Sequence, residues 1–143
     1  MASDCIFCGI ASGEIPAQNI VYSDKNVVAL VDIRPVTRGH VVVVPKKHSR
    51  NMLDMESGDL CEAMRVTQKL ARAVKDAVGA GGVNIHINNE PPAGQVIMHP
   101  HIHIIPRFSD DGLEMWKGKE ASEQEMHEYA ELIKGAIGKE AEA

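Results

Sequence analysis

Three histidines, His99, His101 and His103, occupy alternate positions in the apolar run HPHIHIIPR. Side chains two residues apart on a β-strand share a face and lie about 6.6 Å apart along it, so this spacing predicts a row of imidazoles. Ile102 and Ile104 would then point into the core. The chain has only seven histidines, and crowded imidazoles disfavour each other's protonation, so the row indicates a functional site.

Two chemistries fit such a row: metal ligation through neutral imidazoles, or nucleophilic attack by one imidazole on phosphorus. The row alone does not choose between them. One hypothesis is therefore a metalloenzyme in which His99, His101 and His103 jointly hold a catalytic Zn²⁺ or Fe²⁺.

A second group of candidate ligands lies near the N-terminus, where Cys5 and Cys8 form a Cys-x-x-Cys pair. Two thiolates and two histidines would make a closed tetrahedral zinc site, which is typical of structural zinc. His48 and one histidine of the row are the candidates for the remaining ligands. The alternative is a pair of free thiols on a short helical turn. We expect Cys61, on a long helix, to be an ordinary small core residue.

The segment NNEPPAGQVIM precedes the histidine row. Asn88 and Gln95 offer amide groups, and Gly94 would let a ligand approach the backbone closely. Such groups suit phosphate and ribose oxygens. Turn formation is the alternative explanation for the same residues.

Length and composition limit the classes of protein to consider. The 143 residues, 44% of them hydrophobic, are enough for one core. A net charge of -5 disfavours a broad basic surface for nucleic acid but allows a local pocket for a phosphate-bearing ligand. We expect no secretory signal and no membrane span. Three cysteines do not make an even disulfide framework. These features together predict a cytoplasmic location.

The elements expected to position these residues are short strands and two helices. Apolar spacing and turn residues predict a long amphipathic helix over residues 54–78 that buries Leu60, Met64 and Val74, and strands over residues 20–23, 27–33, 40–47 and 82–89 and along the histidine run. Ser122 and Glu125 form a capping box for a helix reaching about Ile137. This order predicts an α+β fold with a five-stranded antiparallel sheet, one long helix and a C-terminal helix.

Three blocks resemble one known family. GQVIMHPHIHIIPR closely resembles the histidine triad (HIT) signature, VDIRPVTRGHVVVVPKKH resembles the family's ribose-binding segment and following strand, and CIFCGIASGEIPA resembles its opening. The similarity covers roughly residues 4–108. It implies a HIT-like fold, with residues 1–120 as the histidine triad domain and residues 121–143 as a helical extension of the same domain, and it implies a homodimer.

The resemblance also implies roles for individual residues. His101 would attack the α-phosphorus of a nucleotide conjugate to give a covalent nucleotidyl-histidine, and Gln95 and His103 would hold the non-bridging oxygens. Asn88 would support the same site. The implied nucleotide contacts are Asp32 for the ribose hydroxyls and Phe7, Leu30 and Ile33 for the base. The implied ligands of a structural zinc, by similarity to some members and to galactose-phosphate uridylyltransferases, are Cys5, Cys8, His48 and His99.

The resulting functional hypothesis is a nucleotide-conjugate hydrolase or nucleotidyl transferase that acts on purine nucleoside phosphoramidates. The alternatives are a dinucleoside polyphosphate hydrolase of the same family, the metalloenzyme above, and a nucleotide-binding regulatory module. The sequence departs from the family in two places. Glu90, Pro91 and Pro92 replace glycine and small residues of many members, and Val96 follows Gln95 where some members have a hydroxyl.

Overall fold

The computed structural model describes the backbone of residues 4–142 and the side chains of residues 4–140. The chain divides into two compact units, Met1–Gly112 and Leu113–Ala143, each of which is described by itself. The first unit contains all five strands and most of the residues singled out above.

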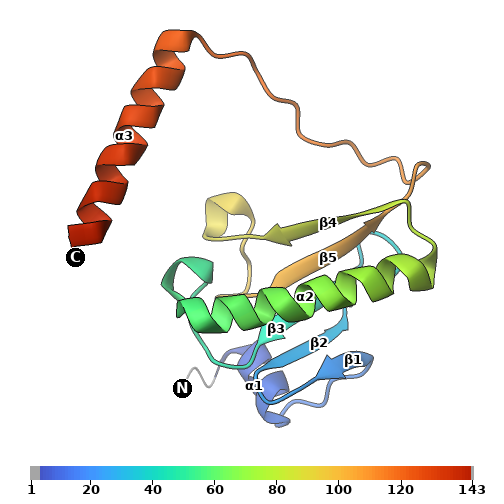
Figure 1. The fold of residues 1–143 in the computed structure, drawn as a ribbon. Helices are drawn as coiled ribbons and strands as arrows, with labels where there is room; N and C mark the ends of the chain where they lie inside the picture. Colours follow the sequence, from blue (N-terminus) through green and yellow to red (C-terminus); the bar gives the residue numbers. More distant parts are fainter. Residues whose placement is uncertain (1–3, 143) are drawn as a thin grey trace. The chain divides into compact units, whose positions relative to one another are not determined.

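The first unit is a five-stranded antiparallel sheet in the order β1-β2-β3-β5-β4, with a long helix and a short helix (Figure 1). Its elements are α1 (Ile6–Ser12), β1 (Ile20–Ser23), β2 (Val27–Val31), β3 (Val41–Pro45), α2 (Ser57–Val78), β4 (Gly82–Ile87) and β5 (Ile102–Arg107), with the 3₁₀ turns η1 (Met52–Asp54) and η2 (Pro91–Ala93). The α+β fold predicted from the sequence is confirmed.

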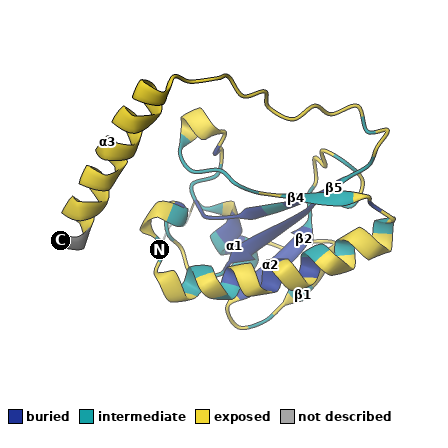
Figure 2. Cartoon of the chain, turned by 45° about the horizontal axis from the view of Figure 1, so that its top comes forward, coloured by how far each residue is buried: buried dark blue, intermediate teal, exposed yellow. Residues whose placement is uncertain are grey.

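The middle of the sheet is buried: β3 is buried throughout, and β2 is buried except at Val31 (Figure 2). Successive side chains of a strand point to opposite faces. One face packs against α2 through a cluster of Val27, Ala29, Val41, Val43, Ala63, Val66, Leu70, Ile102 and Ile104. The other face carries a smaller cluster of Phe7, Val28, Leu30, Val42 and Val44. His103 of β5 therefore belongs to the face opposite α2.

The strand register places a row of residues across this second face. Leu30 pairs with Val42, Val42 pairs with His103, and His103 pairs with His86. Residues directly opposite each other in a sheet point to the same face. The sheet thus brings His86 from β4 beside His103 from β5.

Several boundaries differ from those expected. The paired part of β5 begins at Ile102, so of the three histidines only His103 lies in the strand, while His99 and His101 precede it. The long helix begins at Ser57, because Met55 and Glu56 are extended after the 3₁₀ turn. Its buried side is formed by Ala63, Val66, Thr67 and Leu70.

Two side chains of α2 expected in the core are exposed, namely Met64 and Cys61. Both lie one or two positions away from the buried stripe, which follows residues 63, 66, 67, 70 and 74 around the helix. Thr67 fits in the stripe because its hydroxyl donates to the carbonyl of Ala63 at 2.8 Å.

The second unit contains α3 (Glu123–Glu142). Its start is the predicted capping box: Ser122 Oγ accepts the N–H of Glu125 at 3.2 Å, and Glu125 Oε2 accepts the N–H of Ser122 at 3.0 Å. The helix continues beyond the expected end at Ile137. All its described side chains, residues 123–140, are exposed.

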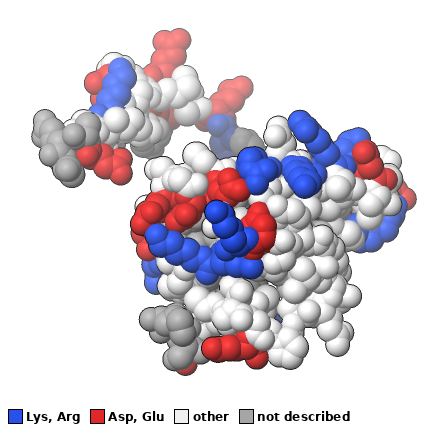
Figure 3. Space-filling view, turned by 60° about the horizontal axis from the view of Figure 1, so that its bottom comes forward, with Lys and Arg blue, Asp and Glu red and all other residues white. Residues whose placement is uncertain are grey.

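One face of the molecule carries charged side chains of both signs (Figure 3). On the face of the molecule in Figure 3, basic and acidic side chains lie interspersed instead of forming one basic patch. Among the described residues, no helix is long and apolar enough to cross a membrane.

Candidate functional site

Four predicted metal ligands converge where α1 meets the segment before β5. Sγ of Cys5 lies 3.4 Å from Nδ1 of His99, and Sγ of Cys8 lies 3.2 Å from Nδ1 of His48. The Nδ1 atoms of His48 and His99 are 3.1 Å apart, and all four ligand atoms lie within 4.8 Å of one another. Ligands of tetrahedral zinc lie about 3.3 to 3.8 Å apart, given bonds of about 2.0 to 2.3 Å. The donor set fits zinc.

Local hydrogen bonds orient two of these ligand side chains, Cys5 and His99. Cys5 is the N-cap of α1, and its Sγ accepts the N–H of Cys8 at 3.4 Å. Nε2 of His99 donates to the carbonyl of Pro45 at 2.7 Å, so the unprotonated nitrogen of a neutral ring is Nδ1, the atom that faces the cysteines.

The protonation states of the free groups also bear on metal binding. Burial lowers the pKa of His99, which favours the neutral imidazole that a metal requires. Burial and the neighbouring Cys5 raise the pKa of the Cys8 thiol to about 11. A bound dication would draw this thiol to the thiolate, because coordinated thiols lose their protons.

The backbone fixes the tautomer of His101. Nδ1 of His101 is 2.8 Å from the carbonyl oxygen of His99. A carbonyl only accepts, so Nδ1 carries the proton and Nε2 of the neutral ring has a free lone pair. The ring is nine-tenths buried and lies against Phe7, with 5.1 Å between ring centroids. This arrangement fixes the orientation of the ring and, in its neutral form, leaves the Nε2 lone pair available.

A chain of hydrogen bonds likewise fixes His103. The N–H of Val36 donates to Nδ1 of His40 at 3.0 Å, so the proton of the neutral His40 ring lies on Nε2. That nitrogen is 2.9 Å from Nδ1 of His103, which must accept. His103 therefore keeps its own proton on Nε2, where it can donate to an oxygen.

Burial keeps this histidine pair neutral. The pKa of His103 falls to about 4, because the ring is buried and lies near His101 and His40. Burial also lowers the pKa of His40, against the opposing effect of Asp32. At neutral pH His103 is thus a hydrogen-bond donor without a charge.

Asp32, the predicted ribose contact, lies just after β2 beside this pair. Its Oδ1 accepts the N–H of Arg34 at 2.8 Å, and its Oδ2 is 3.6 Å from Nε2 of His40. Gly39 has a φ of 85°, and a Cβ there would come within 2.7 Å of Val78, so only glycine lets the chain bring His40 to this place.

The three predicted base contacts lie in different environments. Phe7 and Leu30 belong to the same buried cluster, on the histidine face of the sheet. Ile33 lies in the loop after β2 and is 89% exposed. Phe7 contacts two histidines of the triad, because its ring also lies 5.8 Å from that of His99.

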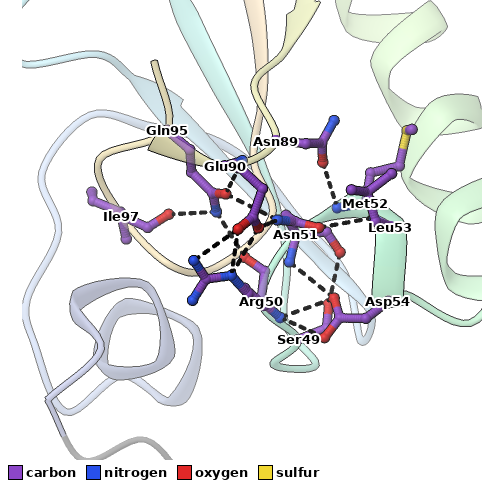
Figure 4. A network of polar contacts seen from close by, with 10 residues as sticks. All are labelled: Ser49, Arg50, Asn51, Met52, Leu53, Asp54, Asn89, Glu90, Gln95 and Ile97. Carbon is purple, nitrogen blue, oxygen red and sulfur yellow. Dashed lines mark hydrogen bonds and ion pairs between the residues drawn. The ribbon is translucent and has the colours of Figure 1, made fainter. Parts of the chain in front are cut away.

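The loop between β4 and β5 holds the two predicted amides. Asn88 follows the end of β4 and is half-buried, next to Gly94. Gln95 is buried, and its amide is occupied within the chain: Nε2 donates to the carbonyls of Arg50 and Ile97. Figure 4 shows that Gln95 belongs to a polar network with Arg50, Asn51 and Glu90.

Sequence reasoning missed part of this arrangement. The sequence gives neither His40 nor His86 a role in the site, yet both flank His103. Arg50 and Asn51 carried no signal, whereas the unusual residue at position 90 could have drawn attention to Glu90.

The hypothesis of a metal held jointly by the triad does not fit the geometry. The described residues contain two groups that could hold a metal ion. One consists of Cys5, Cys8, His48 and His99, and the other consists of Asp32, His40 and His103. His101 belongs to neither group.

Comparison with known proteins gives consistent results. The HIT domain model matches residues 12–110. An uncharacterized HIT-like protein of Methanocaldococcus jannaschii is 43% identical over 131 residues, which cover 92% of this chain and 99% of the relative. An adenylylsulfatase of Arabidopsis thaliana is 34% identical over 113 residues, which cover 79% of this chain and 57% of the relative.

Solved structures share the fold. A protein of Streptococcus mutans has a TM-score of 0.90 at 38% identity, covering 96% of this chain and 87% of that one. A zinc-bound histidine triad family protein of Mycobacterium smegmatis has a TM-score of 0.72 at 38% identity, covering 81% of this chain and 84% of that one. With the domain match and the arrangement of the histidines, these similarities show that the chain belongs to the HIT domain family.

Proposed function

We propose that this chain is a nucleotide-conjugate hydrolase or nucleotidyl transferase that acts through His101, with purine nucleoside phosphoramidates as substrates. The observation that carries the proposal is the tautomer of His101: its Nδ1–H is held by the carbonyl of His99, which leaves Nε2 free to attack. Family membership supports the same class, because HIT domain proteins are generally nucleotide hydrolases.

The proposed reaction has two displacements at the α-phosphorus. The Nε2 lone pair of His101 forms a bond to phosphorus while the bond to the leaving group breaks, and the leaving group departs with the bonding electrons and takes up a proton from solvent. Water then attacks the same phosphorus and gives a proton to solvent, the P–Nε2 bond breaks with its electron pair returning to Nε2, and the nucleoside monophosphate is released.

Several groups of the chain support these steps. The ring of His101 becomes cationic as the bond to phosphorus forms, and the carbonyl of His99 stabilises this charge through Nδ1–H. The Nε2–H of His103 would donate to a non-bridging oxygen. Asp32 would accept ribose hydroxyls, while Phe7 and Leu30 would line one side of the base.

We further propose that Cys5, Cys8, His48 and His99 hold one structural zinc ion. The convergence of their ligand atoms supports this, as does the zinc-bound relative from Mycobacterium smegmatis. When bound, zinc would fix His99, whose carbonyl holds the nucleophile. Both thiols must be reduced to bind it, in agreement with the proposed cytoplasmic location.

The central experiment is release of AMP from an adenosine phosphoramidate of lysine amide, followed by chromatography. Adenosine 5'-phosphosulfate is the second probe, because one relative is named an adenylylsulfatase. A dinucleoside tetraphosphate is the third. Turnover of the phosphoramidate alone supports the proposal, and turnover of another probe reassigns the leaving group. Binding of AMP without turnover of any probe would instead indicate a regulatory module.

Replacing His103 by alanine is expected to slow kcat by about 10²- to 10³-fold, because one donor to the phosphoryl oxygens is lost. Steady-state kinetics with the phosphoramidate measure this effect. The matched control is His127→Ala, since His127 is an exposed residue of α3. Equal kcat values for the two variants would contradict the role of His103.

We propose that two copies of the chain associate through β4, and we expect light scattering to show twice the chain mass of 15.6 kDa. This strand lies at one edge of the sheet with Ile85 exposed, and an unpaired edge invites association. Ile85→Lys should therefore yield monomers, whereas Ile20→Lys at the opposite edge should not. A 15.6 kDa wild-type species at micromolar concentration would rule out this dimer.

A further inference from the structure

A network of polar side chains ties the segment after His48 to the loop before the triad (Figure 4). The guanidinium of Arg50 contacts the carboxylate of Glu90 through two nitrogens, with Nε 2.8 Å from Oε2 and the second nitrogen 2.9 Å from Oε1. Asn51 donates from Nδ2 to the same carboxylate and to Oε1 of Gln95. Asn51 and Gln95 are buried, and Arg50 and Glu90 lie at the surface.

Glu90 adopts a backbone conformation that its residue type disfavours. Its φ is 76° and its ψ is 154°, a region occupied almost solely by glycine. A side chain there persists only when surrounding contacts hold it in place. Glu90 meets this condition, because Arg50 and Asn51 bind its carboxylate and its N–H donates to Oε1 of Gln95 at 2.8 Å.

Gln95 has no free N–H for a phosphate oxygen. Its Nε2 donates to the carbonyl of Arg50 at 2.7 Å and to that of Ile97 at 3.0 Å, which uses both hydrogens. Its Oε1 accepts from Asn51 and from the N–H of Glu90. The Gln95 side chain therefore links the backbone at Arg50 to the backbone at Ile97. This role differs from the phosphate contact that family resemblance implies for Gln95.

Backbone hydrogen bonds connect Gln95 to the proposed nucleophile, His101. The carbonyl of Ile97 accepts from Gln95 Nε2 and also from the N–H of His99 at 2.9 Å. The carbonyl of His99 in turn holds Nδ1 of His101. Each link is one hydrogen bond, so a shift of Gln95 would be transmitted to the imidazole that attacks.

We propose that Arg50, Asn51 and Glu90 are positioning residues of the reaction: they fix Gln95 and, through it, the orientation of His101. This inference rests on the proposed function for its kinetic readout. It assigns Gln95 to orientation of the nucleophile and not to the binding of substrate.

The kinetic test compares Glu90→Gly with wild type. Glycine accepts this backbone conformation, so the variant should fold, while the contacts to Arg50 and Asn51 are lost. We expect kcat with the phosphoramidate to fall about tenfold and KM to change less than about twofold, because orientation is impaired but nucleotide contacts remain. Unchanged kcat would overturn the inference.

Exchanging the charges of Arg50 and Glu90 distinguishes a positioning role of this ion pair from a purely structural role. Arg50→Glu places two carboxylates together and should lower kcat at least as much as Glu90→Gly. Adding Glu90→Arg to it restores an ion pair of reversed polarity and should recover part of kcat. The control is Glu62→Gln, which breaks the Arg65–Glu62 pair on α2 and should leave kcat unchanged. No recovery in the double variant would count against positioning.

Hydrogen exchange provides a readout without turnover. In Glu90→Gly, amides of residues 88–97 should exchange faster than in wild type, while those of α2 keep their protection. Unaltered exchange in the loop would overturn the inference even if the wild type hydrolyses the probe. If the wild type hydrolyses no probe, the proposed function fails, and faster loop exchange still supports the structural link.

Discussion

Replacing His101 by alanine is expected to reduce turnover of the adenosine phosphoramidate by about 10⁴-fold or more, because the variant has no nucleophile. Neither neighbouring imidazole can take over. His99 faces the two cysteines through Nδ1 and Pro45 through Nε2, while Nδ1 of His103 accepts from His40. Steady-state and single-turnover kinetics measure the loss.

AMP binding by this variant should remain within a few-fold of wild type by calorimetry, because the proposed base and ribose contacts lie elsewhere. His127→Ala again serves as the control and should keep full activity. The intermediate gives a direct test: mass spectrometry of enzyme quenched at alkaline pH should find a nucleotidyl group on the peptide that contains His101. An adduct on another residue, or an active His101→Ala enzyme, would falsify the mechanism.

Replacing Cys8 by serine is expected to abolish zinc binding and to lower the unfolding midpoint by about 10 °C. A metal present at about 100 times its dissociation constant stabilises the native state by about 2.7 kcal/mol, which corresponds to a shift of this size. Plasma emission spectrometry should find about one zinc per wild-type chain and none in the variant. Calorimetric scans give the midpoint.

The chain offers a matched control in Cys61, an exposed thiol on α2 away from the proposed ligands. Cys61→Ser should keep both the zinc and the midpoint. We also expect Cys8→Ser to lower kcat, because His99 would lose its fixed position and its carbonyl orients His101. Stoichiometric zinc in Cys8→Ser, or zinc loss in Cys61→Ser, would refute the assigned ligands.

Local features of the fold were predictable because they depend on neighbours in sequence. Apolar runs, continuous or alternating, and the turn residues between them predicted the strands, and Ser122 with Glu125 predicted the start of α3 through contacts only three residues apart. The placement of Ile102 and Ile104 in the core follows from the same period of two. The precise start of α2 was not predictable, because it depends on the turn at Met52–Asp54.

Within the site, the sequence by itself determined which residue types were available. It showed three histidines in alternation and two cysteines three residues apart, with His48 and one histidine of the row as candidate partners, and family resemblance then implied His99 as that histidine. Each such pattern lies within a short stretch of chain, where covalent geometry fixes the spacing. Which nitrogen of each imidazole carries the proton does not follow from these short stretches of sequence.

Only the tertiary structure decided the roles of the imidazole nitrogens and of the surrounding residues. The proton of His103 is located by His40, 63 residues away, and the loop before the triad is held by Arg50, 40 residues from Glu90. Such contacts depend on strand register and loop conformation. A tautomer follows from the hydrogen-bond partner of each nitrogen, and those partners meet only when the sheet is assembled.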